Sequence, residues 1–519
     1  MTEAFFQPII EKSIQADTLF WREYSAGFFL TSKGEIREVL RGAMTFSSLF
    51  FILFFLPLFT FFYFRQQGIE RKNRILLIFS LVFYAFGGIR YLLLLFAMNG
   101  AVWYCALHIQ AASNARLRKR WLVLAIAVPA AVLVFFKYTG FLLGSFGALF
   151  RQDWPAWQLA LPLGISFYTF KLISYAADVY LKKTDAQESY LELLLYTALF
   201  HHCTAGPIVR YTDMKPELAN RKVTADGIAS GIFRFCTGLA KKSILADHCG
   251  ELANSLLPLS GDLSSVPAAG VWLGSLLYML QIYLDFSAYS DMALGLGQMI
   301  GFHYKENFNY PYMATSVKDF WKRWHISLSS FFRDYVYIPL GGNRRSGGRM
   351  ILNLLIVWLL TGFWHGASWN YILWGLYYFL FIVFENYRGN QNARPWHPAL
   401  NHCYTLAVVY AGWILFRFED PEAMGTAFLG LFGLNGNGAG GPAVSLILKN
   451  NLFFLIAAII AVTPAAARLC RLLASRLEQR GITPAVLYVP RLILSILFLG
   501  LSILALAGNS YTPFLYNQF

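Results

Sequence analysis

Long apolar stretches, separated by short polar or basic segments, follow one another along the chain from Met44 onward. The first, residues 44–64, has about 20 residues, which is enough for a helix to cross the hydrocarbon core of a bilayer. Residues 138–150 and 190–208 are apolar but short or poorly flanked, which suggests re-entrant segments. The pattern predicts about 11 or 12 transmembrane or re-entrant helices in all. The other predicted spans lie near residues 75–88, 91–112, 121–136, 159–181, 228–245, 268–300, 350–365, 369–386, 403–417, 446–463 and 487–507.

The composition narrows the class of protein. Of the 519 residues, 57% are hydrophobic and 14% are charged, whereas soluble domains contain about 25% charged residues. Aromatic residues make up 17%, and the six cysteines are spread along the chain without a paired motif. These features exclude a disordered chain and a disulfide-stabilised scaffold. We therefore predict an all-α, polytopic integral membrane protein that is embedded in the lipid bilayer.

The net charge of +15 indicates the topology of the chain. Lys and Arg accumulate in the cytoplasmic loops of membrane proteins, so this charge is expected without a nucleic-acid partner. Basic clusters at residues 65–74 and 116–120 fall on one side of the membrane, as a pair of antiparallel helices requires. Residues 243–304 contain no Lys or Arg, and the acids at their beginning predict an extracytoplasmic loop near 246–267.

Two segments are expected to lie along the membrane surface rather than across it. Residues 1–43 carry several acids and lack the features of a signal peptide, so we interpret them as an interfacial or peripheral extension. Residues 318–349 are basic, and their first part alternates aromatic and basic residues at helical spacing, which predicts a helix in the cytoplasmic interface. The membrane domain then comprises residues 44–519, with a motif core at about 159–386 and C-terminal helices at 403–507.

His365 is the main candidate for catalysis. If its helix starts near Arg349 at the cytoplasmic surface, the imidazole lies 16 residues in, about 24 Å along the axis. Ionisable groups at such depth are costly and mark functional sites, and burial favours a neutral ring that is able to accept a proton. Gly362 and Gly366 allow a substrate or another backbone to approach closely. A buried histidine that bonds a neighbouring carbonyl is the alternative.

Other polar residues are weaker candidates. His325 lies in the basic, aromatic segment, where an exposed polar position is the alternative. Asp285, Tyr289 and Asp291 fall in one apolar span, which suggests polar contacts inside the bundle, with hydrogen bonds between helices as the simpler role. Residues 201–203 read His-His-Cys but lack a further ligand at the usual spacing, so we expect no metal site.

Four groups of residues, taken together, resemble motifs of the membrane-bound O-acyltransferase (MBOAT) family, and in particular its bacterial branch that acts on polysaccharides. The resemblance runs from about Met44 to the end of the chain, including residues 509–519, and it implies the MBOAT fold. The four groups are Leu161–Asp178, Ala205–Tyr211, Gln281–Asp291, and Phe320–Ser329 together with Phe363–Gly366.

The resemblance also assigns roles to residues. His365 matches the essential histidine of the family and His325 its second histidine, both facing a funnel that opens to the cytoplasm. Five further residues are expected to pack behind the two histidines and to hold their side chains in place: Asp285, Tyr289, Asp291, Asp319 and Trp364. Five basic residues are candidates to bind the phosphates of the acyl donor, with lipid headgroups as their alternative partners: Lys322, Arg323, Arg333, Arg344 and Arg345.

The reaction implied by the resemblance is transfer of an acyl group, expected to be acetyl, from a cytoplasmic thioester such as acetyl-CoA, which is a substrate rather than a bound cofactor. The implied setting is the bacterial inner membrane, with polysaccharide-synthesis machinery nearby, an exported polysaccharide such as alginate as acceptor, and a periplasmic or extracellular SGNH-type acetyltransferase as partner. Proton abstraction by His365 and transient acylation of its ring both stay open. The alternatives are a D-alanyl transfer protein for teichoic acid, a transporter and a non-enzymatic scaffold.

Overall fold

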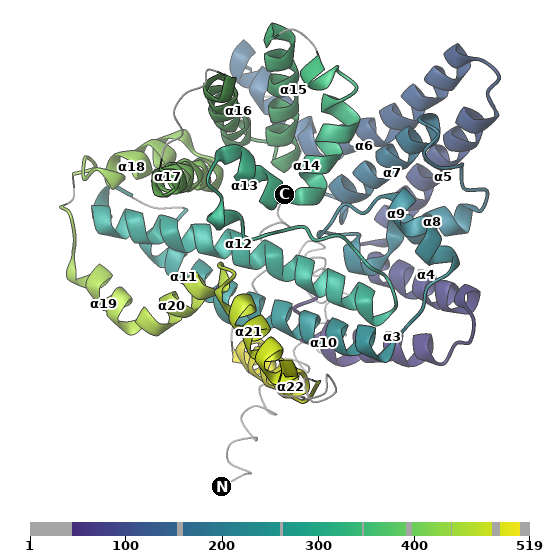
Figure 1. Ribbon diagram of the computed structural model, residues 1–519. Coiled ribbons are helices and arrows are strands. Elements are labelled where there is room, and N and C mark those ends of the chain that lie inside the picture. The colour runs from purple at the N-terminus through teal and green to yellow at the C-terminus, as the bar shows by residue number, and fades with distance from the viewer. Residues whose placement is uncertain are drawn as a thin grey trace, which may run out of the picture.

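The structure is a computed structural model, and within the residues that it describes the chain consists of helices, turns and short coils, without a strand (Figure 1). The predicted all-α class is therefore confirmed. The N-terminal extension (1–43), the terminal segment 509–519 and Arg345 lie outside the described residues. The described residues are 44–152, 159–259, 263–344, 347–390, 397–436, 438–479 and 488–508.

Helical elements of very different lengths make up the described chain. The longest are α6 and α12, and the shortest are single 3-10 or π turns that connect α-helices. In chain order the elements are η1 (Phe51–Phe55), α3 (Leu56–Phe64), α4 (Ile69–Ala85), α5 (Ile89–Ala111), α6 (Ala115–Phe150), α7 (Ile165–Tyr180), α8 (Tyr190–Ala198), η2 (Phe200–His202), α9 (Tyr211–Ala219), α10 (Ala225–Ala240), η3 (Lys241–Ala246), α11 (Asp247–Leu256), η4 (Leu263–Ser265), α12 (Ala268–Met299), η5 (Pro311–Met313), α13 (Val317–Arg323), α14 (Ile326–Phe332), η6 (Arg333–Tyr337), η7 (Gly342–Arg344), α15 (Gly347–His365), α16 (Trp369–Asn390), α17 (Pro398–Arg417), α18 (Pro421–Leu431), α19 (Pro442–Asn450), α20 (Leu452–Ala461), α21 (Ala465–Gln479) and α22 (Tyr488–Gly508).

Within the described part of the chain, six helices are long and apolar enough to cross a membrane: α5, α6, α12, α15, α17 and α22. The pair α19 and α20 would add a seventh span, but these helices meet at an angle of 70° where one straight span was predicted near 446–463. The other predicted segments form shorter or more polar helices. Residues 190–208, for example, fold into α8, a 3-10 turn and coil that are mostly buried in protein, as non-helical backbone at membrane depth must be.

Helix α6 corrects one prediction. Residues 121–136 and 138–150 were expected to be separate segments, but they belong to a single helix of 36 residues, about 54 Å long. Lys137 interrupts the apolar pattern of the sequence without interrupting the helix. Its ammonium group bonds backbone carbonyls of another helix, 2.5 Å from the oxygen of Trp364.

The loop predicted near 246–267 is also wrong for its first half, because residues 246–256 are helical. Helix α10, the π turn η3 and helix α11 follow one another with helical backbone throughout. The acid that suggested an exposed loop, Asp247, instead forms an ion pair of 2.6 Å with the buried Lys242. The acidic residue Asp247 therefore indicated an internal ion pair and not an exposed loop. A buried charge without a partner costs too much folding free energy.

Helix α12 is the centre of the fold and crosses the middle of the molecule, with α10 packed along it (Figure 1). Small residues make the close packing possible. A Cβ atom on Gly231 of α10 would lie 2.6 Å from the carbonyl oxygen of Gly295 of α12, and one on Gly238 would lie 2.7 Å from that of Ala288. Small residues at such crossings are typical of helix pairs in membranes, where backbones approach closely.

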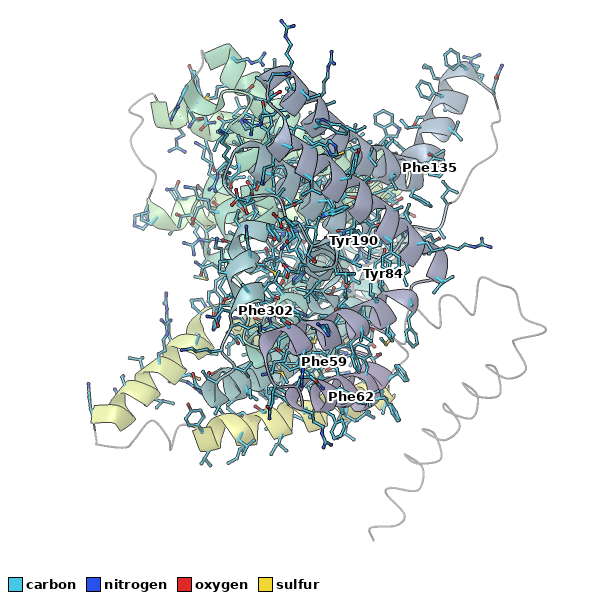
Figure 2. All side chains as sticks on the ribbon, turned by 90° about the vertical axis from the view of Figure 1, so that its right-hand side faces the viewer. Phe59, Phe62, Tyr84, Phe135, Tyr190 and Phe302 are labelled. Carbon is cyan, nitrogen blue, oxygen red and sulfur yellow. The ribbon has the colours of Figure 1, made fainter. Side chains whose placement is uncertain are left out.

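The first helices present aromatic rings both inward and outward (Figure 2). Phe59 of α3 is buried, and its ring centroid lies 5.0 Å from that of Phe200. Phe62 of the same helix and Phe135 of α6 are exposed. Outward-facing apolar rings of this kind are expected where a helix meets lipid rather than water.

Helices α15 and α16 form the tightest crossing near the candidate site. A Cβ atom on Gly362 would overlap the carbonyl oxygen of Tyr371, and one on Gly375 would overlap that of Trp358. A Cβ atom on Gly366 would overlap the ring of Tyr371. The close approach expected at Gly362 and Gly366 is thus made by a neighbouring helix of the same chain.

Replacing Gly362 with alanine is expected to destabilise the protein by about 1–3 kcal/mol, because the added methyl group meets backbone that cannot move aside. Gly500→Ala is a matched control, since Gly500 also lies within a helix but a Cβ atom added there would meet open space. Thermal denaturation in detergent should show a lower transition temperature for Gly362→Ala alone. Equal transition temperatures for the two variants would contradict the close crossing.

Candidate active site

His365 is the last residue of α15 and has 1% of its surface exposed. Aromatic rings surround the imidazole: the centroid of Trp364 lies 5.0 Å away, that of Trp374 4.9 Å and that of Phe416 5.3 Å. Three helices, α15, α16 and α17, supply these rings. The imidazole therefore lies inside the protein and does not face lipid.

His325 lies at a break between the short helices α13 and α14, with φ of 44°. The continuous interfacial helix predicted here is therefore wrong. Neighbouring backbone causes the break: the amide of Ile326 donates to the carbonyl of Asn307 at 2.9 Å, and the amide of Asn309 donates to the carbonyl of Arg323 at 2.9 Å. These bonds replace bonds that a continuous helix would make, and they turn His325 inward, where 1% of its surface is exposed.

The side chain of Asn307 orients the imidazole of His325. Its Oδ1 accepts hydrogen bonds from the Ser327 amide at 3.1 Å and the Ser327 hydroxyl at 2.8 Å, and lies 3.2 Å from His325 Nδ1. A carbonyl oxygen can only accept, so Nδ1 carries the proton and Nε2 carries the lone pair. Burial lowers the pKa of His325 to about 3, which keeps this ring neutral.

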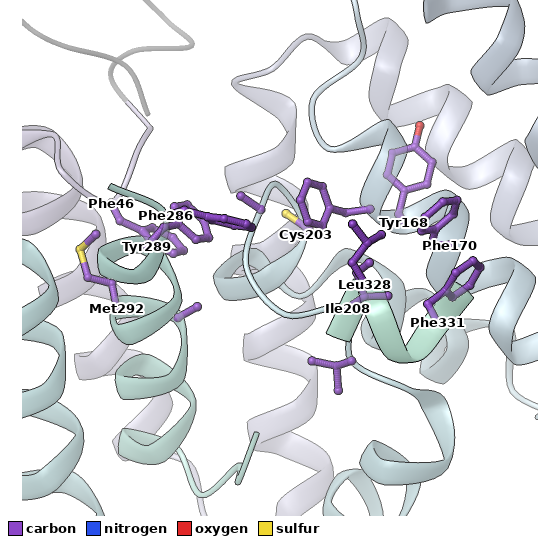
Figure 3. Packing of buried hydrophobic residues seen from close by; sticks show 14 of the residues in the cluster. Phe46, Tyr168, Phe170, Cys203, Ile208, Phe286, Tyr289, Met292, Leu328 and Phe331 are labelled. Atoms are coloured by element: carbon purple, nitrogen blue, oxygen red, sulfur yellow. The ribbon is translucent and has the colours of Figure 1, made fainter. Parts of the chain in front are cut away.

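The structure brings the two histidines to the same aromatic residue. The ring of Trp364 lies 5.9 Å from that of His325 and 5.0 Å from that of His365. Phe286 of α12 closes the other side of His325 at 4.8 Å. Behind Trp364, Phe170 of α7 lies 5.7 Å away and stacks on Phe331 at 4.1 Å. Figure 3 shows Phe286 beside Tyr289 on one side of this core and Phe170 facing Phe331 on the other.

Of the five residues expected to support the histidines, Trp364 contacts both imidazoles. The other four are bonded elsewhere: Asp285 to Lys242 at 2.8 Å, Asp291 to Lys241 at 2.8 Å and to Arg234 at 3.0 Å, Tyr289 to Thr204 at 2.5 Å, and Asp319 to Arg323 at 3.0 Å. The acids of α12 thus hold this helix to η3 and α10. These contacts are the interhelical bonds that the sequence offered as the simpler role.

The basic candidates divide into two groups. Arg323 is bonded to Asp319, and Arg333 is bonded to Asp334 at 2.7 Å. Lys322 and Arg344 have exposed side chains. Arg344 lies in η7, which packs against α15 close to the start of that helix. Because α15 has 19 residues, about 28 Å of helix separates this basic end from His365.

Residues 201–203 lie buried in and beside η2. His202 Nδ1 is 2.5 Å from the ammonium nitrogen of Lys171, and His201 Nε2 is 2.5 Å from the hydroxyl of Tyr304. Among the residues that the structure describes, no group of three or more His, Cys, Asp or Glu side chains could hold a metal ion.

Sequence reasoning missed two residues at the site. Lys137 bonds the backbone of Trp364 and His365, and its signal was present: a single lysine inside an apolar run marks a functional position at membrane depth. Asn307 lies in a polar connection without periodicity, and nothing in its sequence surroundings indicates that it holds His325. Only the folded chain places it there.

The fold and the site together define a polytopic helical membrane enzyme with two buried histidines at one tryptophan. The chain matches the profile of the MBOAT, membrane-bound O-acyltransferase family, over residues 181–419, which include both histidines. It is 40% identical over 405 residues to the probable alginate O-acetylase AlgI of Pseudomonas aeruginosa, covering 75% of each chain. Identity to that of Pseudomonas putida is 35% over 507 residues, covering 92% of this chain and all of the relative.

More distant relatives extend the comparison. The peptidoglycan O-acetyltransferase of Helicobacter pylori is 34% identical over 429 residues, which cover 76% of this chain and 80% of the relative. The chain belongs to the membrane-bound O-acyltransferase family. It is therefore an acyltransferase and a multi-pass membrane protein, rather than a transporter or a scaffold.

Asn307→Ala is expected to lower acyl transfer by about 10-fold or more, because it removes the acceptor of bonds that are each worth about 1 kcal/mol and that orient His325. Asn309→Ala is the matched control, since Asn309 takes part in this segment through its backbone amide. Both variants should be assayed for acyl transfer per amount of folded enzyme. Equal activities would show that Asn307 does not hold the imidazole in place.

Proposed function

We propose that this protein takes an acetyl group from a cytoplasmic thioester such as acetyl-CoA and passes it across the bacterial inner membrane for O-acetylation of an exported polysaccharide. The observation that carries the proposal is the meeting of His325 and His365 at the ring of Trp364. Both imidazoles lie inside the protein, and His365 is about 28 Å along α15 from the basic end of that helix. Relatives named alginate O-acetylase and peptidoglycan O-acetyltransferase support acetyl as the group and a polymer as the acceptor.

The proposed reaction joins an acceptor hydroxyl to the acyl carbon of the thioester. The hydroxyl oxygen forms a bond to the carbonyl carbon, the carbon–sulfur bond breaks, and a thiol is released. His365 accepts the hydroxyl proton during the attack and returns it to the departing sulfur, so that the ring is neutral again after each turnover. Surrounding rings exclude water, which keeps the thioester from hydrolysis.

His325 acts beside His365 in this proposal. The bond to Asn307 fixes the proton on Nδ1 and leaves the lone pair on Nε2. A neutral ring that is held in one orientation is suited to bind a hydroxyl or thiol hydrogen at that atom. Acylation of His365 itself is the other route, and rapid quenching followed by mass spectrometry distinguishes the two by the presence or absence of an acyl-histidine peptide.

The donor enters from the basic end of α15 in this proposal. Exposed cations such as Lys322 and Arg344 are suited to hold the phosphates of a coenzyme A thioester by charge-assisted hydrogen bonds. A long thioester arm then reaches the histidines. On the opposite side, an SGNH-type acetyltransferase in the periplasm receives the acetyl group and completes the transfer to the polymer.

A D-alanyl donor is the second candidate, because the teichoic acid D-alanyltransferase of Bacillus subtilis is 31% identical over 273 residues. That match covers 49% of this chain and 67% of the relative, whereas the O-acetylase matches cover 75% or more. The longer matches favour acetyl. Supplying purified protein with labelled acetyl-CoA or with a labelled D-alanyl carrier protein decides between the donors.

His365→Ala is expected to abolish acetylation of the polymer, a loss of at least about 100-fold, because the proton acceptor is removed. His325→Ala should also lose most of the activity. His303→Ala is the control, since the side chain of His303 is 73% exposed and bonds Glu217 at the surface. The measurement is polymer-bound acetate in cells with equal amounts of folded protein; near-normal acetate with His365→Ala would defeat the proposal.

The double variant Lys322→Gln and Arg344→Gln is expected to raise KM for acetyl-CoA several-fold while kcat stays close to the wild-type value, because phosphate contacts stabilise the bound donor throughout the reaction. Lys119→Gln, at the exposed start of α6, controls for loss of one surface cation. Steady-state kinetics at two salt concentrations provide the measurement. An unchanged KM would assign these cations to lipid headgroups instead.

A further inference from the structure

Side chains of α6 bond the carbonyl groups at the end of α15, although the two helices are far apart in the sequence. The hydroxyl of Tyr138 donates to the carbonyl of Phe363. The ammonium nitrogen of Lys137 lies 2.5 Å from the carbonyl oxygen of Trp364 and 3.3 Å from that of His365. Two adjacent residues of α6 therefore bond the last three peptide carbonyls of the helix that carries His365.

These bonds satisfy the backbone carbonyl groups that are left over at the end of every α-helix. The last carbonyls of an α-helix have no amide partner within the helix, and hydrocarbon offers no water in its place. Residues 366–368 connect α15 directly to α16, so the chain turns back within a few residues. The C-terminal end of a helix also carries partial negative charge, which attracts a cation. A lysine from a neighbouring helix supplies both the donors and the charge.

Aromatic contacts fix the same region. The ring of Tyr138 stacks on that of Phe363 with centroids 3.7 Å apart and an angle of 9° between the planes. One turn further along α6, Phe141 contacts Trp369, the first residue of α16, at 5.4 Å. The ammonium group of Lys137 lies 5.9 Å from the centre of the Trp364 ring, which contacts both imidazoles. Helix α6 thus holds the turn at which His365 is placed.

We propose that Lys137 is a positioning residue of the acyl-transfer site, and this rests on the function proposed above. Its bonds to the carbonyls of Trp364 and His365 fix the last peptide planes of α15. The direction of the His365 Cα–Cβ bond follows from those planes, and the imidazole follows from that bond. Misplacement of a reacting group by about 1 Å costs roughly 100-fold in rate, so a loose helix end would impair catalysis even when both histidines are present.

The test compares variants of the full-length protein in membranes that contain its partner, with radiolabelled acetyl-CoA as the probe. Lys137→Met keeps the length of the side chain but removes its donors, and Lys137→Arg keeps a cation that can donate to carbonyls. Tyr138→Phe removes one donor and keeps the ring. Lys119→Met removes an exposed lysine from the same helix and serves as the control.

Lys137→Met is expected to lower kcat by about 100-fold while KM for acetyl-CoA stays within roughly 2-fold of the wild type, because the donor is still bound but the imidazole is misplaced. Lys137→Arg should recover a substantial part of the lost kcat, and Tyr138→Phe should show a smaller loss. Size-exclusion chromatography in detergent gives the amount of folded protein for each variant. Activities are expressed per folded molecule, so a folding defect alone does not lower them.

Three results overturn the positioning role but not the proposed function, provided that the wild type is active and His365→Ala is inactive. The first is a wild-type kcat in Lys137→Met, and the second is a raised KM with kcat retained in that variant. The third is an arginine variant as impaired as the methionine variant, because the bonded cation would then not be what matters. A wild type that transfers no acetyl group overturns the proposed function, and the positioning role with it.

Discussion

The buried end of one helix organises the candidate site. Helix α15 stops at His365 inside the protein, where its last carbonyls must find donors that water would otherwise supply. Lys137 and Tyr138 of α6 provide those donors. The close crossing of α15 and α16 at Gly362 then fixes the direction in which the chain continues. Because these contacts act on the same few peptide groups, they give the imidazole a defined place through the backbone that carries it.

Aromatic rings form the wall around this point. Trp364 contacts both imidazoles, and rings from α7, α12, α16 and α17 surround the three residues. Large, flat side chains fill space between helices that meet at different angles, and they leave little room for water. In such surroundings the interaction of an imidazole with a hydroxyl or thiol hydrogen is stronger than in water. Under the proposed function, these aromatic residues serve the chemistry as well as the packing.

Ion pairs hold the central helix in place. The π turn η3 directs Lys241 and Lys242 toward α12, where they pair with Asp291 and Asp285. Removing one partner from the buried pair of Lys242 and Asp285 leaves an uncompensated charge, which is costly inside the protein. These pairs therefore fix how α10 and η3 lie against the central helix. The same central helix contributes Phe286 to the surroundings of His325. The ion pairs therefore also determine, indirectly, the position of Phe286 beside that imidazole.

The sequence alone determined the class of protein and the all-α fold and predicted the two histidines as the site, because hydropathy, motif residues and depth along a helix are properties of neighbouring residues. Tertiary structure decided that the helix breaks at His325 and that Asn307 orients that imidazole. It also decided that α6 continues through Lys137 and that residues 246–256 are helical where a loop was predicted. In each case the deciding partner is remote: Asn307 for the break, the end of α15 for Lys137, and Lys242 with Asp285 for the acids. A polar residue in an apolar run reveals that it needs a partner, but only the packed chain reveals which partner it has.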